Sequence, residues 1–208
     1  LDTTNERPGV LPSTRWKRDH LGKPWYPGET LSAGIGQGYM LTTPVQLAVA
    51  TSVLATRGVQ RVPHLLKSVG GVAVEAPEVS RIEASPEHWD AIFESMRAVV
   101  HSRRGTARKI GEGMQYEMAS KTGTAQVIGI AQGAIYREDE VAERHRNHGL
   151  FIAFAPIEAP TIALAVIVEN GGGASVASPI ARAVLDDWLL REPPQPDAAA
   201  SEGVPVDG

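Results

Sequence analysis

The chain has no cysteine among its 208 residues, so it carries neither a disulfide framework nor a thiolate metal site. It also lacks an uninterrupted apolar run of 18 residues, and the sequence therefore predicts no segment that spans a bilayer. Its formal net charge is −4 at pH 7, which gives no basic surface for nucleic acid. These absences leave a globular protein without nucleic-acid partners.

A hydrophobic fraction of 42% in a chain of this length is enough for one domain with a real core. We expect that domain to occupy residues 1–191. Residues 192–208 lack large apolar side chains and are predicted to form a disordered tail. The chain begins at Leu1 without a signal-like segment, so we expect it to be part of a longer protein.

Two helices are well marked. Thr43 can cap the first, which has Pro44 at its first position and stops before Gly58. It is apolar nearly all round and is predicted to be buried. The second runs from Pro86 to about His101, with an apolar stripe at 3 and 4 spacing: Ile92, Phe93, Met96, Val99 and Val100.

Three β-rich runs follow, at 119–129, 150–156 and 161–170. The last two are separated by a short turn and predict an antiparallel hairpin. A closing helix is expected over 178–190. The fold class is therefore α+β, with an antiparallel sheet flanked by helices.

The remaining segments give weaker signals. Residues 1–30 are rich in proline and glycine and are predicted to form an irregular connector. A small peripheral hairpin is expected around Gly70-Gly71. The charged stretch 131–149 predicts a loop with a short exposed helix.

The stretch "ASKTGTA" raises the question of function, because it places a cation, two hydroxyls and a glycine in a strand. Alternation puts Lys121 and Gly123 on one face and Thr122 and Thr124 on the other. A glycine within a strand often marks the close approach of a ligand or another backbone. The set suits an extended substrate with an anionic end, bound along a sheet edge. An ordinary strand whose lysine reaches solvent fits these four residues equally well.

The wider sequence favours the first interpretation. Lys-Thr-Gly is the third motif of the serine penicillin-recognising enzymes. The segment "GIGQGYMLTTPVQLAVATSVLATRG" resembles the one around the buried helix of class B penicillin-binding proteins, and "ERHRNHGLFIAFAP" resembles strands that follow Lys-Thr-Gly there. The stretches "KPWYPGETLSAGIGQGY" and "RVPHLLKS" are most similar to the elongation-type members. The resemblance runs in collinear order over roughly residues 1–190.

This resemblance implies a D,D-transpeptidase of lateral wall elongation and cell shape, which cross-links peptidoglycan stem peptides through a serine acyl-enzyme and is inhibited by β-lactams. Lys121 would supply charge near the nucleophile, and the Thr122 and Thr124 hydroxyls would bind the substrate carboxylate. The Thr124 N–H would form half of the oxyanion hole, and Gly123 would keep the edge clear. No cofactor or metal is implied.

The first two family motifs are missing. No serine is followed three positions later by lysine, and Thr14-Arg15-Trp16-Lys17 has threonine instead. Ser-x-Asn is absent as well. We therefore expect this chain to be the C-terminal portion of the transpeptidase domain, with half of the active site and inactive alone. The nucleophile and the membrane anchor would lie upstream, at the periplasmic face of the bacterial inner membrane.

Several alternatives stay open. A division-type class B enzyme, a β-lactam-sensing module and a serine β-lactamase share the fold. The expected partners are peptidoglycan stem peptides, β-lactams, the upstream half of the protein and elongation-machinery membrane proteins. Of the six histidines, only His145 and His148 are close, and neighbouring arginines argue against a metal.

"GIGQG" predicts a turn rather than a phosphate loop, with Gln37 and Tyr39 near the cleft. Arg103 or Arg104 could lie at the cleft mouth.

Overall fold

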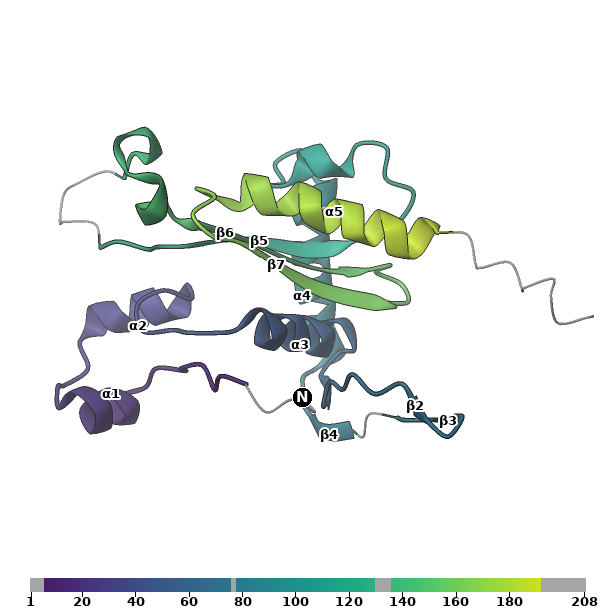
Figure 1. Cartoon of the computed structure of the whole chain (residues 1–208), viewed down its shortest axis with the longest axis horizontal. Helices are drawn as coiled ribbons and strands as arrows, with labels where there is room; N and C mark the ends of the chain where they lie inside the picture. Colours follow the sequence, from purple (N-terminus) through teal and green to yellow (C-terminus); the bar gives the residue numbers. More distant parts are fainter. Residues whose placement is uncertain (1–5, 76–77, 130–135, 192–208) are drawn as a thin grey trace, which may run out of the picture.

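The computed structural model describes residues 6–75, 78–129 and 136–191. At its centre is a three-stranded antiparallel sheet in the order β5-β6-β7 (Figure 1). The strands are β5 (Ala119–Ala125), β6 (His148–Ala155) and β7 (Ile162–Val168). The predicted hairpin of the last two runs is confirmed by their register, in which Gly149 lies opposite Val168.

Helices cover both faces of this sheet (Figure 1). Helix α5 (Ala174–Leu190) packs on one face, against β6 and β7. On the other face, α4 (Pro86–His101) packs against β5, and α3 (Pro44–Ala55) packs against β7. The predicted α+β class, an antiparallel sheet flanked by helices, is confirmed.

The core has one layer on each side of the sheet. Phe151 and Leu185 are fully buried between the sheet and α5. Phe93 of α4 meets Phe154 of β6 on the opposite side, with ring centroids 5.0 Å apart. Aromatic burial of this kind contributes about 2–3 kcal/mol per side chain, so both layers hold the sheet in place.

Helix α3 begins as predicted, because the Thr43 hydroxyl accepts from the Gln46 N–H at 3.1 Å and the Gln46 side chain accepts from the Thr43 N–H. The prediction that it is buried is only half right. Val53 is buried, whereas Val45 is 39% exposed. The outer side of α3 lines a hollow of about 650 Å³ together with Val62 and other apolar residues.

Residues 1–30 are more regular than predicted, since they contain α1 (Thr14–Leu21) and α2 (Pro27–Gly34). Some of the prolines and glycines that indicated a connector lie at helix ends instead. Pro27 is the first residue of α2, and Gly22 ends α1 at φ 63°. Proline and glycine can begin or end a helix as well as interrupt one.

One buried cation joins these two helices. Lys17 is 1% exposed, forms an ion pair with Glu29, and has its Nζ 4.4 Å from the centre of the Tyr26 ring. The hydrogen bond from Lys17 lowers the pKa of Glu29 below its ordinary value. A buried charge needs a partner of this kind, so the pair fixes α1 against α2.

The peripheral elements are small. A hairpin of β2 (Ser68–Val69) and β3 (Val72–Ala73) turns at Gly70-Gly71 as predicted, and both glycines have positive φ. Strand β1 (Val59–Arg61) pairs with β4 (Glu78–Arg81).

Short 3-10 helices complete the chain at η1 (Arg108–Gly111), η2 (Glu138–Glu140) and η3 (Glu143–His145). The last two lie in the predicted charged loop. Among the residues that the structure describes, no helix has the length and apolar character needed to cross a membrane. The tail predicted at 192–208 lies outside the described residues.

A histidine at the end of α4 makes stability depend on pH. The Met118 N–H donates to His101 Nε2 at 3.1 Å, and burial lowers the pKa of His101 below its ordinary value of 6.5. The unfolded chain therefore binds more protons than the folded one as pH falls below about 6.5, and stability falls with it until the folded pKa is passed.

We expect the unfolding free energy of the full-length protein to fall between pH 7 and pH 5, and this slope to flatten in His101→Gln, which keeps an acceptor for Met118. Urea midpoints across this range measure it. His88→Gln, an exposed position on the same helix, is the matched control and should keep the wild-type slope. An unchanged slope in His101→Gln would rule out this source of pH dependence.

Candidate active-site edge

The Lys-Thr-Gly-Thr residues lie on β5, one of the two edge strands of the described three-stranded sheet (Figure 1). Thr122 lies opposite Phe151, which packs toward α5, and Lys121 lies opposite Ile152, which packs toward α4. Alternation therefore places Thr122 and Thr124 on the α5 side and Lys121 and Gly123 on the α4 side, as the sequence predicts.

The backbone of Thr124 faces the free edge of the sheet. Its C=O accepts a hydrogen bond from Gln37 Nε2 at 2.6 Å, on the side away from β6. In an antiparallel strand the N–H and C=O of one residue point to the same side, so the Thr124 N–H also points outward. An outward N–H is the geometry that an oxyanion-binding donor needs.

The Lys121 side chain is exposed and turns toward the same edge. Its Nζ donates to the Thr122 C=O at 2.7 Å. The ammonium group therefore lies beside the outward backbone groups of the strand. This places a positive charge next to a row of donors, which favours an anionic or partly anionic ligand.

The Thr122 hydroxyl has a partner that the sequence did not reveal. Its Oγ1 lies 3.1 Å from Oγ1 of Thr106, in the segment that leads from α4 toward β5. Gly105 lets this segment pack closely against the end of α4, because a Cβ there would lie 2.3 Å from the Val99 carbonyl oxygen. Arg103 and Arg104, predicted near the cleft mouth, are exposed in the same segment.

Gly123 also matters for the packing of β5 against β6, in addition to its predicted role of keeping the strand edge clear. A Cβ at this position would lie 3.1 Å from the Cβ of Leu150 on β6. That separation is tighter than ordinary van der Waals contact, so a side chain here would require Leu150 to shift slightly. The glycine allows close approach of a neighbouring strand, whatever it does for a ligand.

Gln37 reaches the candidate site, as predicted for a residue near the cleft. Besides Thr124, its side chain contacts the Gln126 N–H, which donates to Oε1 at 3.4 Å. Tyr39 packs elsewhere, with its ring 5.4 Å from the ring of Trp16. The "GIGQG" segment is therefore a structural turn, with Gly36 and Gly38 at positive φ. It places the Gln37 side chain against β5.

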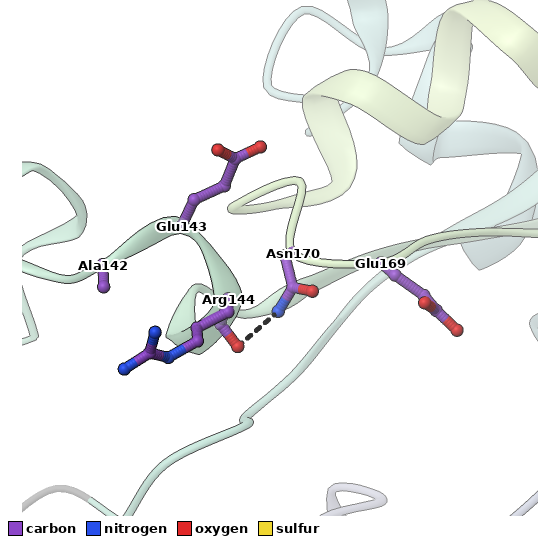
Figure 2. A pocket seen from close by; sticks show the side chains of 5 residues that line it. All are labelled: Ala142, Glu143, Arg144, Glu169 and Asn170. Carbon is purple, nitrogen blue, oxygen red and sulfur yellow. Dashed lines mark hydrogen bonds between the residues drawn. The ribbon is translucent and has the colours of Figure 1, made fainter.

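A second polar region lies where η3 meets the turn after β7, around a hollow of about 540 Å³ (Figure 2). Asn170, at φ 55°, donates from Nδ2 to the carbonyls of Arg144 and Arg146. The side chains of Glu143 and Glu169 point away from each other in Figure 2. Asn170 thus supports the turn, and the side chains that line the hollow form no convergent catalytic group.

The two close histidines are engaged in separate hydrogen bonds. Arg144 Nε donates to His145 Nε2 at 3.3 Å, and the Asn170 N–H donates to His148 Nδ1 at 2.9 Å. Within the described ranges no three His, Cys, Asp or Glu side chains gather in a way that could hold a metal ion.

Comparison with known proteins agrees with this architecture. Residues 1–186 match the sequence family described as the penicillin binding protein transpeptidase domain. The chain belongs to this family. The resemblance to penicillin-binding proteins is therefore confirmed.

Individual relatives point to one branch of the family. The chain is 40% identical over 209 residues to the peptidoglycan D,D-transpeptidase MrdA of Acinetobacter baumannii, covering 98% of this chain and 31% of that protein. A crystal structure of Pseudomonas aeruginosa PBP2 in complex with WCK 5153 aligns with a TM-score of 0.79 at 43% identity, covering 98% of this chain and 43% of that one. The Helicobacter pylori PBP2–MreC complex aligns at 0.67 with 26% identity, covering 89% and 32%.

The similarity therefore confirms the predicted family, and these relatives are MrdA and PBP2 proteins. The chain spans about a third of the curated relative that it matches.

Proposed function

We propose that the protein containing this chain is a peptidoglycan D,D-transpeptidase that acts in lateral wall elongation and cell shape. The observation that carries this proposal is the outward-facing Thr124 N–H beside the Lys121 ammonium, at the free edge of β5 in a member of the penicillin-binding family. This is an arrangement for binding an extended peptide whose carbonyl becomes an oxyanion during reaction.

The proposed reaction is acyl transfer through a serine. The serine hydroxyl attacks the carbonyl of the penultimate D-alanine of a stem peptide, and the terminal D-alanine leaves with a proton on its amine. An amine of a neighbouring stem peptide then attacks the ester, forms the cross-link and returns the proton to the serine. A β-lactam acylates the same serine and traps it.

Each residue of the motif has a proposed role. Lys121 supplies positive charge close to the nucleophile, and the Thr124 N–H donates to the oxyanion. The hydroxyls of Thr122 and Thr124 bind the substrate carboxylate, or its counterpart in a β-lactam. Gly123 lets the substrate backbone approach the edge, in addition to its packing against Leu150.

The nucleophile is proposed to lie in the part of the protein upstream of this chain, because no serine here has a lysine three residues later. The same upstream part would hold the anchor that keeps the domain at the periplasmic face of the inner membrane. Partners from the elongation machinery are proposed because the similar H. pylori protein is found in complex with MreC.

The experiment that tests this function uses the full-length protein. It is incubated with a donor peptide ending in D-alanyl-D-alanine and an acceptor with a free side-chain amine, and products are separated by mass spectrometry. We expect release of D-alanine and formation of the cross-linked dimer, both blocked by penicillin.

The same assay distinguishes the alternatives. A β-lactam-sensing module would be acylated by penicillin without forming dimer, and a β-lactamase would hydrolyse the drug with rapid turnover. Either result would overturn the transpeptidase proposal. The division-type alternative is disfavoured by the identity to MrdA proteins.

A further inference from the structure

The Gln37 side chain behaves toward β5 as a short piece of neighbouring strand would. Its amide donates to the Thr124 C=O at 2.6 Å and accepts from the Gln126 N–H at 3.4 Å. These are the two groups, two residues apart, that an added strand would pair with on the outward side. The Gln37 side chain therefore provides hydrogen-bond partners for two backbone groups at the outward edge of β5.

The contact with Gln37 lies at the end of β5, where the pairing of β5 with β6 also ends. The last pair between β5 and β6 joins Ala125 to His148, and residues 126–128 have no regular structure. A strand end with one neighbour opens easily. The two hydrogen bonds from Gln37 hold the Thr124–Gln126 backbone, and with it the direction of the Thr124 N–H.

Gln37 is itself held firmly. Its N–H donates to the Ser32 C=O at the end of α2 at 2.8 Å, and the flanking Gly36 and Gly38 both have positive φ, which fixes a tight reversal. Two residues later, the Tyr39 ring packs on Trp16. The loop is therefore anchored on both sides of Gln37, to α2 and to α1.

We propose that Gln37 is a positioning residue, which fixes the Thr124–Gln126 edge so that the Thr124 N–H points at the reacting carbonyl. The inference rests on the proposed acyl-transfer function and adds a residue to it. Gln37 acts through Thr124 and does not touch the reacting atoms. Its contribution is alignment of the oxyanion donor before the substrate arrives.

Two variants of the full-length protein distinguish the hydrogen bond that Gln37 donates to Thr124 from the one that it accepts from Gln126. Gln37→Ala removes both hydrogen bonds. Gln37→Glu keeps the size and an acceptor for the Gln126 N–H, but a carboxylate cannot donate to the Thr124 C=O. We expect both to slow acylation by a fluorescent penicillin, by roughly ten- to a hundredfold, because alignment of the donor is lost.

A spectroscopic readout shows whether the oxyanion donor is affected. The infrared stretch of the acyl-enzyme ester carbonyl moves to lower frequency when an N–H donates to it, so we expect a shift to higher frequency in Gln37→Ala. Gln60→Ala is the matched control, since Gln60 accepts from Ser80 at 2.7 Å in the peripheral β1–β4 pair. It should change neither rate nor stretch.

Hydrogen exchange of the Gln126 amide tests whether Gln37 holds the backbone at the end of β5. This measurement does not depend on acylation. We expect faster exchange there in Gln37→Ala than in wild type. Wild-type acylation rate and carbonyl stretch in both Gln37 variants would overturn the proposal, as would unchanged exchange at Gln126. A wild-type protein that penicillin does not acylate would instead remove the proposed function, and exchange would still decide whether Gln37 holds the strand.

Discussion

Replacement of Lys121 by alanine in the full-length protein is expected to slow acylation by a fluorescent penicillin by roughly 10²–10³-fold. This corresponds to about 3–4 kcal/mol, the typical cost of losing one preorganised electrostatic group at a reacting centre. The Lys121 ammonium is exposed at the free edge of β5, beside the outward C=O of Thr122. Its removal takes away the positive charge closest to the outward Thr124 N–H on this strand.

The folded structure should tolerate this change. The hydrogen bond of Lys121 goes to the adjacent residue, and it takes part in none of the ion pairs described for the chain. A substitution at an exposed surface position typically changes stability by less than about 0.5 kcal/mol. The melting temperature of Lys121→Ala should therefore stay close to that of the wild type.

Two further variants sharpen the test. Lys67→Ala removes an exposed lysine from the loop before β2 and should acylate at the wild-type rate. Lys121→Arg keeps the charge on a longer, planar group and is expected to fall between the wild type and the alanine variant. Normal labelling by Lys121→Ala, at unchanged melting temperature, would show that the lysine is an ordinary solvent-facing strand residue.

The fold was predictable where local signals and burial agree. Helix α3 could be predicted from Thr43 and Pro44, because its capping box lies within four consecutive residues. The hairpin of β6 and β7 was visible because both strands are apolar and joined by a short turn. Residues 1–30 were mispredicted because α1 and α2 are short, and because the burial of Lys17 against Glu29 and Tyr26 has no pattern along the chain.

The candidate site shows the same division. The motif at Lys121–Thr124 and its alternation between two faces could be read directly. Its partners could not, since Gln37 meets Thr124 across 87 positions and Thr106 meets Thr122 across 16. A glutamine between two glycines predicts a turn, and no local rule states which strand its amide will reach. Tertiary packing decides that, and packing is what a single sequence leaves open.

The last expected result concerns where the drug attaches. After treatment of the full-length protein with a β-lactam, peptide mapping should find no adduct on residues 1–208. A serine nucleophile needs a base close by, which the family provides as a lysine three positions later, and no serine here has one. Ser120, adjacent to Lys121, is fully buried and its Oγ has no hydrogen-bond partner in the described structure, so no group there can take its proton.

The chain produced alone is expected to remain unlabelled, and to regain labelling when co-expressed with the upstream part. The roles proposed for β5 are an oxyanion donor and hydroxyls that bind a carboxylate, and neither of these groups would attack a carbonyl. The exposed apolar side of α3, around Val45 and Val49, gives the upstream part a surface to cover. Intact-mass analysis of the mixture should place the added mass on the upstream fragment. An adduct on any serine of residues 1–208 would mean that the nucleophile lies here, and the half-site assignment would be wrong.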